Sequence, residues 1–440
     1  MSLSRRSFLL GSAAFSLLGE RLAAAVPGAE LFERPDGRAA DFLLCRRLHL
    51  DICGRLPTRA ETEAFVASAE SDKVERLVER LLDSDGFADY WSMRYSDILR
   101  VKSEFPINLW PNAVYVYHRR IRAAVASDEP WDAFARALLG GRGSNFRVPE
   151  ANFLRAVSER TPEGLSKAVS TTFLPKPTAD YAAYFSRVAW KSTREWKEEI
   201  VYLKDGSDAD TPEAFAERLT DGDLRDAFVA AHVSHVHWWL FGSEPSAKRL
   251  EEWTELLEDA NLRLKPFLKA VFARDEYLAG PVRGDFPARR LDAEVLDDAI
   301  CDLTGAEHSF VSIAPEPFTY LPKSRRSVLI EDGSISSPFL LLFGRPARDT
   351  GLVSERNNAI TAKQRLYLYN SGKLAGSLNR MIGSPAFQAL KRPEKIDDLY
   401  LRFLSRRPTD AELGVIESER VLPRDLAWLL VNSREFLYRI

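Results

Sequence analysis

The 440-residue sequence contains only three cysteines, Cys45, Cys53 and Cys301. So few cysteines cannot build a disulfide framework, although an oxidising compartment would permit one bridge. Cys45 and Cys53 are eight residues apart, which on a continuous helix is a rise of roughly 12 Å and beyond the reach of a disulfide. No Cys-x-x-Cys-His segment occurs, so the sequence excludes covalent attachment of a c-type haem.

The sequence also lacks an excess of one charge. Its 61 lysines and arginines face 64 acidic residues with no long block of one sign, which argues against binding to nucleic acid or to an anionic membrane. After the first 25 residues no apolar run approaches the length of a membrane span. The absence of Gly-x-Ser-x-Gly, phosphate-loop, His-Glu-x-x-His and dinucleotide motifs argues against the common hydrolase, kinase and dehydrogenase classes. A non-enzymatic role is favoured.

The N-terminus has the pattern of an export signal. Ser4-Arg-Arg-Ser-Phe-Leu9 precedes an uncharged stretch that runs through Leu18, and Arg21-Leu-Ala-Ala-Ala25 provides small residues for cleavage. This pattern is typical of a twin-arginine signal peptide over residues 1–25, with Val26 as the mature start. The alternative is a short amphipathic helix that begins the fold. We expect a periplasmic or extracellular protein.

A repeat links the two ends of the chain. Residues 48–61 resemble residues 399–412, and at nearly equal distances residues 81–87 resemble residues 430–436. In the first copy Pro57 should end one helix, and Thr58 with Glu61 should form a capping box that begins the next. Each copy therefore predicts a helix-turn-helix module.

The rest of the sequence predicts a mainly α, multi-helical protein with little β structure. Apolar residues recur with a helical period in the following segments: 74–82, 114–125, 131–138, 212–237, 247–257, 266–278, 291–303 and most of 362–440. Residues 141–149 read as a loop, and 198–206 and 326–330 as short strands. The acidic stretch 205–211 is the expected boundary between an N-terminal domain, 26–204, and a C-terminal domain, 205–440.

Several segments resemble a known pair of domains. Residues 46–58, 128–134 and 180–188 are similar to the first of two domains of unknown function found together in exported proteins of planctomycetes and their relatives. The second domain is similar to residues 286–300, 325–329, 355–366 with Asn370, and 432–436. Such domains often accompany cytochrome c-like modules, and the resemblance supplies no catalytic residues. Where the family usually has Cys-x-x-Cys-His, this chain has Thr171-Thr-Phe-Leu-Pro-Lys-Pro-Thr178.

Three histidines form one candidate site. His232 and His235 are one helical turn apart and could share a zinc or copper ion with further ligands from elsewhere, whereas His237 points away from His235. The alternative is that these are interior histidines, hydrogen-bonded to the backbone beside Trp238 and Trp239.

Carboxylates near residue 295 form a second candidate site. Glu294 and Asp298 are four residues apart and could act as acid and base in a desolvated cleft; the alternative is a solvated, ion-paired helix face. The candidate binding residues are Arg290, Asp292, Glu294, Asp298, Arg356 and Gln364. Trp110, Tyr115, Tyr117 and the Trp238-Trp239 pair could line a carbohydrate or partner surface, although most such residues belong to the core.

These features support three functional hypotheses. The first is an exported binding or scaffold protein that docks a protein partner and carries no cofactor. The second is a metal-dependent or redox accessory enzyme that uses His232 and His235. The third is a polysaccharide hydrolase that uses Glu294 and Asp298.

The signal interpretation can be tested by export. Replacing Arg5 and Arg6 by lysine should leave the protein in the cytoplasm, because the arginine pair is the expected address of the twin-arginine route. Immunoblots of periplasmic and cytoplasmic fractions measure this. An unchanged periplasmic yield of the double variant would contradict the signal.

The missing haem motif makes a second prediction. The mature protein, made in cells competent for cytochrome c maturation, should show no Soret absorbance and no haem retained after denaturation, because covalent attachment needs two thiols and an adjacent histidine. The alternative is non-covalent haem bound through His235 or His237, which would need a deep apolar slot, whereas Trp238, Trp239 and Phe241 beside those histidines argue as readily for a filled core. A stoichiometric Soret band would contradict this and return the chain to a redox role.

Overall fold

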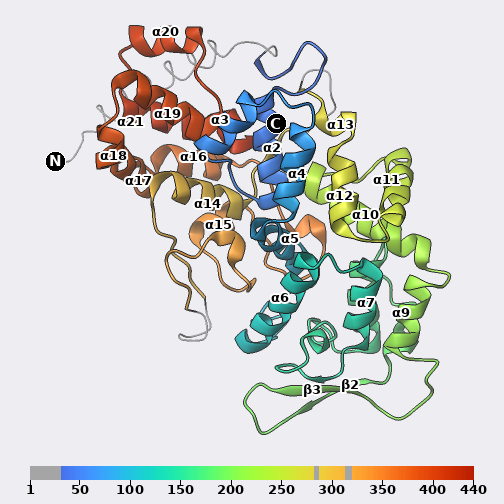
Figure 1. Cartoon of the computed structure of the whole chain (residues 1–440). Coiled ribbons are helices and arrows are strands. Elements are labelled where there is room, and N and C mark those ends of the chain that lie inside the picture. Colours follow the sequence, from blue (N-terminus) through green and yellow to red (C-terminus); the bar gives the residue numbers. More distant parts are fainter. Residues whose placement is uncertain (1–30, 282–286, 313–319) are drawn as a thin grey trace.

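The computed structural model describes residues 31–281, 287–312 and 320–440, and the predicted export signal lies outside these ranges. Over these residues the protein is mainly α-helical with little β structure, as predicted (Figure 1). No helix in the described ranges is both long enough and apolar enough to cross a membrane. All three cysteines are buried free thiols, so Cys45 and Cys53 are not bridged.

Both ends of the chain fold into the same succession of four helices. The first copy contains α2 (Asp41–Cys53), α3 (Arg59–Ala67), α4 (Lys73–Leu82) and α5 (Asp85–Ile98). The second copy contains α19 (Arg392–Leu404), α20 (Asp410–Ser418), α21 (Pro423–Val431) and α22 (Arg434–Leu437). In each copy a serine, Ser84 or Ser433, caps the fourth helix through its side chain. The repeat predicted from the sequence is therefore confirmed.

The turn between the first two helices is also the same in both copies. Gly54 follows the last residue of α2 and Ser405 follows the last residue of α19, and both are left-handed, with φ of 57° and 59°. A left-handed residue turns the chain out of the helix while its N–H still bonds a helix carbonyl. The prediction that Pro57 ends the first helix is wrong, because α2 ends before Gly54.

Each turn is closed by a capping box and an ion pair: Thr58 with Glu61 at α3, and Thr409 with Glu412 at α20. Arg55 donates two hydrogen bonds to Glu61, at 2.8 and 2.7 Å. Arg406 donates two to Glu412, both at 2.8 Å. The arginine thus clamps the carboxylate that completes the cap, and the sequence repeat reproduces one three-dimensional motif.

The two repeat copies pack against each other although they lie far apart in the sequence. In Figure 1, α3 lies beside α19 and the C-terminus lies beside α2. Arg46 of α2 donates to the carbonyl oxygens of Phe403 and Phe436, at 2.9 and 3.1 Å. Arg439 forms a buried ion pair with Asp51 of α2, with an N–O distance of 2.8 Å. These contacts join the ends of the chain.

The helices between the two copies were largely predicted. They are α6 (Pro111–Ala126), α7 (Trp131–Gly140), α8 (Pro162–Phe173), α9 (Pro212–Thr220), α10 (Arg225–Phe241), α11 (Ala247–Asp259), α12 (Leu264–Phe272), α13 (Asp275–Leu278), α14 (Ala293–Thr304), α15 (Pro338–Leu342), α16 (Ala362–Asn370), α17 (Gly372–Ile382) and α18 (Pro385–Gln388). The single helix predicted over 212–237 is two helices, because the polar Asp-Gly-Asp segment after Thr220 interrupts it.

The strands are short and antiparallel. β1 (Gly143–Ser144), β2 (Val188–Ser192) and β3 (Glu199–Leu203) form a sheet in the order β1-β3-β2, and β4 (Arg289–Arg290) pairs with β5 (Tyr438–Arg439). β3 confirms the strand predicted over 198–206, whereas β1 lies in the segment predicted to be a loop. The strand predicted over 326–330 is wrong. Residues Ser327–Leu329 form a 3-10 turn because Asp298 accepts the N–H groups of Ser327 and Val328.

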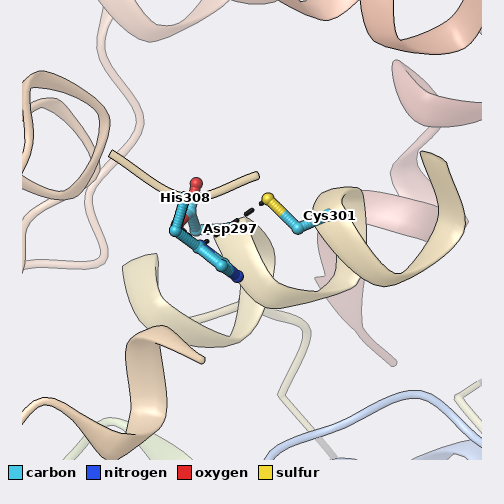
Figure 2. Close-up of side chains that lie close together, drawn as sticks. All are labelled: Asp297, Cys301 and His308. Atoms are coloured by element: carbon cyan, nitrogen blue, oxygen red, sulfur yellow. Dashed lines mark hydrogen bonds and ion pairs between the residues drawn. The ribbon is translucent and has the colours of Figure 1, made fainter. Parts of the chain in front are cut away.

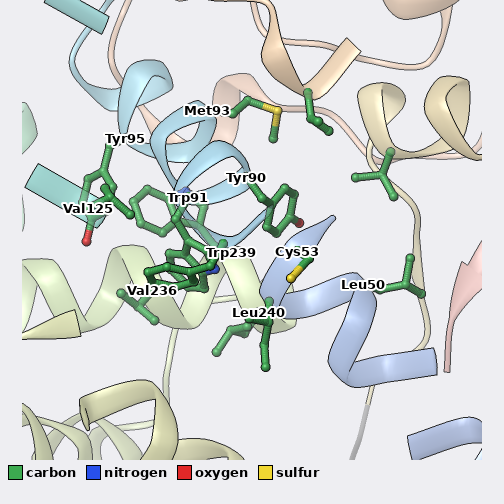
Figure 3. Packing of buried hydrophobic residues seen from close by; sticks show 14 of the residues in the cluster. Leu50, Cys53, Tyr90, Trp91, Met93, Tyr95, Val125, Val236, Trp239 and Leu240 are labelled. Carbon is green, nitrogen blue, oxygen red and sulfur yellow. The ribbon is translucent and has the colours of Figure 1, made fainter. Parts of the chain in front are cut away.

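Aromatic residues of α5 and α10 pack against one another in the core (Figure 3). Trp91 meets Trp239 edge to face, with ring centroids 5.8 Å apart, and Tyr95 meets Trp239 at 5.1 Å. Buried apolar residues from both repeat copies and from the helices between them belong to the same cluster. The boundary predicted at 205–211 lies between β3 and α9, where residues 205–210 are exposed, and a division into domains there stays a prediction.

The paired caps provide a stability test. Thr58→Ala and Thr409→Ala should each lower the free energy of unfolding by about 1 kcal/mol, because the N–H of the glutamate loses its acceptor. Thr171→Ala is the control, since Thr171 lies within α8 and bonds only its own helix, so its loss should be nearly neutral. Denaturant titration measures all three. A neutral cap variant would contradict the equivalence of the two turns.

Candidate functional site

Three of the acidic residues around α14 are buried rather than solvated. Asp292, Glu294 and Asp298 are at most 2% exposed. The interpretation of this segment as a solvated helix face is therefore wrong. Its periodicity predicted the helix, but the arginines that cover it come from elsewhere in the chain.

Glu294 belongs to a buried network that joins α5 to α14. Arg356 donates to both carboxylate oxygens of Glu294, at 2.6 and 3.1 Å, and to Asp97 of α5 at 2.8 and 3.1 Å. Arg348 reaches the other oxygen of Asp97 at 2.9 Å, and Arg345 lies 3.2 Å from Glu294. Each buried carboxylate is thus shared between two guanidinium groups.

Asp292 is held by a second group of donors beside this network. Arg94 of α5 forms an ion pair with one of its oxygens, which Tyr90 also approaches at 3.1 Å. Asn358 donates to the other oxygen at 2.9 Å, and Arg289 lies 3.7 Å away. The N-terminal end of α14 is therefore fixed by residues from two distant segments, α5 and the loop around Asn358, and by the neighbouring Arg289.

The neighbouring arginines keep the carboxyl groups of Asp292 and Glu294 ionised. Burial would raise the pKa of Asp292, but the charges of Arg94, Arg289 and Arg356 outweigh burial and hold it well below its usual range. Burial opposes ionisation of Glu294 too, and Arg356 lowers its pKa in the same way. Both groups are carboxylates at neutral pH.

The remaining candidate binding residues organise the backbone. Arg290 donates to the carbonyl oxygens of Leu291, Phe343, Asn357 and Asn358. Gln364 completes the capping box of α16 and donates to Leu342 at 2.9 Å. Both side chains hold the loop that carries Arg356 in place.

Asp298 lies in a different cluster from Glu294. Besides the N–H groups of Ser327 and Val328, it contacts Arg326 at 3.3 Å and His308 at 3.6 Å. Burial is the main cause that raises its pKa to about 7. Asp298 and Glu294 share no partner, so the geometry gives no support to an acid and base pair made from them.

A cavity of about 360 Å³ opens beside the arginine network. Its lining consists of Arg94, Trp238, Phe241, Gly242, Ala288, Arg289, Ser354, Arg356, Asn357, Asn358 and Ala359. Within the described part of the chain, this arginine pocket has three arginines in its wall and no carboxylate. The buried Nε and Nη1 of Arg94 and Nε of Arg289 have no hydrogen-bond partner among the described residues. The volume is in the range of small-ligand sites.

The sequence pointed to only part of this pocket. Arg356 and Trp238 were among the candidate residues, whereas Arg94 was missed because no local pattern marks it. Asn358 lies in the segment 355–366 that resembles the family, but it was not among the candidate residues. The only local signal for Arg289 was its position just before the acidic segment. The pocket residues come together through contacts between segments about 200 residues apart, such as the contact of Arg94 with Asp292.

The three histidines of α10 bond separate partners. His232 bonds the hydroxyl of Tyr95 at 2.8 Å, His235 the carbonyl of Thr172 at 3.1 Å, and His237 the carbonyl of Ser243 at 2.7 Å. Burial lowers the pKa of His232 to about 3 and that of His235 to about 4. The geometry favours interior histidines.

A metal at His232 and His235 would need further ligands, and the described residues bring no third one to this pair. The cavity beside His232 has a volume of about 20 Å³, which is room for one water molecule. A different group of side chains, Asp297, Cys301 and His308, brings three potential ligand atoms together (Figure 2).

The aromatic candidates are divided between core and surface. Tyr117 and Trp239 are buried, whereas Tyr115 is exposed. Trp110 is partly buried and meets Trp196 edge to face, with centroids 4.5 Å apart. Trp238 is the candidate that lines the arginine pocket.

Comparison with known proteins identifies the family. Residues 30–190 match a family model described as PSCyt2, a protein of unknown function (DUF1549). Residues 281–419 match a second model, PSD1, also a protein of unknown function (DUF1553). The chain therefore belongs to the family of proteins that carry this pair of domains in this order, as the resemblance implied. No curated protein and no solved structure matches it.

The central role of Arg356 can be tested by stability. Arg356→Met should lower the free energy of unfolding by about 3–5 kcal/mol, because two buried carboxylates lose their shared partner. The control is Arg424→Met, since Arg424 is 63% exposed and should cost less than about 1 kcal/mol. Denaturant titration at neutral pH measures both.

The free energies of unfolding of the native protein and Arg356→Met should differ less at acidic pH. The fold lowers the pKa values of Asp292 and Glu294, so their stabilisation is present above the unfolded pKa of about 4 and is lost as pH falls through the folded values. The gap between the native protein and Arg356→Met should shrink on acidification below about pH 4. A difference in the free energy of unfolding that is small at neutral pH, or constant with pH, would contradict the role of Arg356 in the network.

Proposed function

We propose that this protein is an exported binding protein that docks a protein partner through the arginine pocket. The observation that carries the proposal is a cavity of about 360 Å³ with Arg94, Arg289 and Arg356 in its described wall and no carboxylate there. A guanidinium offers a planar fork of donors that matches a carboxylate. The partner should therefore present an acidic segment.

The neutral part of the wall supports a peptide rather than a bare ion. Trp238 and Phe241 offer aromatic surface, and Asn357 and Asn358 offer amide groups, next to the arginines. An aromatic and arginine-rich concave site is the composition of interface centres that contribute most to affinity. A glutamate or aspartate side chain of the partner would bind the arginines, and the backbone beside it would contact the aromatic and amide groups.

Binding accounts for the pocket better than catalysis does. Its described lining includes Ser354 as a hydroxyl group but no histidine and no carboxylate that could serve as a general base. The carboxylates behind the wall are held ionised by arginines and serve to position them. We further propose that the protein acts in the periplasm or outside the cell and needs no haem.

The binding proposal can be tested with defined peptides. A glutamate hexapeptide should quench the fluorescence of Trp238 and should bind with an affinity that falls as salt rises, whereas a glutamine hexapeptide should not bind. Arg289→Gln should abolish binding, since Arg289 lines the pocket and is 12% exposed. Arg424→Gln is the matched control and should bind normally, because Arg424 does not line the pocket. Isothermal titration calorimetry provides the affinities.

Equal binding of the glutamine peptide, or undiminished binding by Arg289→Gln, would contradict the proposal. Binding of citrate or sulfate with loss of peptide binding would show that the site takes a small anion and not a partner. Arg289→Gln must retain the circular dichroism spectrum of the native protein for its result to count.

A further inference from the structure

Helix α14 and the chain that follows it bring three potential metal ligands together, away from the arginine pocket. Asp297 and Cys301 are four residues apart, so they lie on the same face of α14. The helix ends at Thr304, and Gly305, with a φ of 64°, turns the chain back and places His308 over this face. Figure 2 shows the three side chains pointing toward one another.

The distances between the donor atoms suit a single small cation. Sγ of Cys301 lies 3.6 Å from Nδ1 of His308, and Nδ1 lies 2.8 Å from a carboxylate oxygen of Asp297. All three donor atoms lie within 4.8 Å of one another. Zinc bond lengths in a tetrahedral site place sulfur and nitrogen ligands roughly 3.6 Å apart. The Asp297 oxygen would move outward by about 0.5 Å to reach the corresponding nitrogen–oxygen spacing.

The surroundings of His308 provide a second, independent indication. Histidines that bind a metal through one ring nitrogen usually direct the other toward a carboxylate. Nε2 of His308 lies 3.6 Å from Asp298, on the side of the ring opposite the cluster. Asp298 is itself fixed by the N–H groups of Ser327 and Val328. The ring is therefore oriented with Nδ1 toward Cys301 and Asp297.

A fourth position is present and the cluster is not sealed. The hydroxyl of Ser327 lies 2.6 Å from the Asp297 oxygen and 3.4 Å from Nδ1 of His308. A water molecule or this hydroxyl can complete a tetrahedron there. The Asp297 side chain is 15% exposed, which gives an ion a path from solvent.

We propose that Asp297, Cys301 and His308 form a site for one zinc-class divalent cation, with Asp298 as the positioning residue for His308. One thiolate, one imidazole and one carboxylate are ligand types that zinc accepts together. The ion would tie α14 to the chain around His308 and Ser327. This site is separate from the histidines of α10.

The chain contains a natural comparison in α2. There Cys45 lies 3.7 Å from Nδ1 of His49, but that nitrogen bonds the carbonyl of Cys45 itself. Glu61 approaches the other ring nitrogen of His49, at 3.4 Å. Donors on opposite sides of an imidazole cannot share one ion, so a close cysteine and histidine are not sufficient for a site.

Cobalt titration of the full chain, after removal of bound metal with EDTA, tests the proposal. One equivalent of Co²⁺ should produce the near-ultraviolet charge-transfer band of a cobalt–thiolate bond, and one equivalent of Zn²⁺ should remove it. Cys301→Ser should abolish the band, and His308→Gln should weaken binding at least tenfold. Cys45→Ser is the matched control and should leave both the band and the affinity unchanged.

Absence of the band in the native protein, its persistence in Cys301→Ser, or its loss in Cys45→Ser would overturn the site. X-ray absorption of the zinc-loaded native protein provides a measurement that needs no variant. It should show one sulfur and three nitrogen or oxygen ligands. A zinc ion with only oxygen and nitrogen ligands would overturn the proposal even if Cys301→Ser fails to fold.

Discussion

The guanidinium group of Arg356 lies between two buried carboxylates from distant parts of the chain, Asp97 on α5 and Glu294 on α14. Asp97 belongs to the segment matched by the first family model, whereas Glu294 and Arg356 belong to the second. Buried ions are costly unless each charge is paired and hydrogen-bonded. Packing these helices without Arg356 would leave uncompensated charge in the core, so the contact of α5 with α14 around Asp97 and Glu294 depends on Arg356.

The same network explains why a cationic pocket exists beside it. Asp292, Glu294 and Asp97 require arginines around them, and Arg94, Arg289 and Arg356 each present part of their surface to the cavity wall. The carboxylates lie behind this wall and fix the arginines before any ligand arrives. Such preorganisation lowers the cost of ordering side chains on binding. Structural pairing and the proposed recognition of an acidic partner are thus two uses of one set of residues.

Local features of the fold could be predicted from the sequence, and contacts between distant segments could not. The caps at Thr58 and Thr409 were predictable because every partner lies within three residues. Arg94 meets a carboxylate 198 residues away, and no periodicity marks such a contact. A metal site was predicted at the histidines of α10 from their spacing alone. Cys301 and His308 were overlooked as a pair because a left-handed glycine, not a helical repeat, brings them together.

Differential scanning calorimetry tests most directly whether the buried pairing makes the two parts one structural unit. Here the two parts are the segments matched by the two family models. The native protein should unfold in one transition whose calorimetric enthalpy equals its van't Hoff enthalpy, because the buried Asp97 of the first part is paired with Arg348 and Arg356 of the second part. Two separate transitions in the native protein, each with its own two-state enthalpy, would contradict this account.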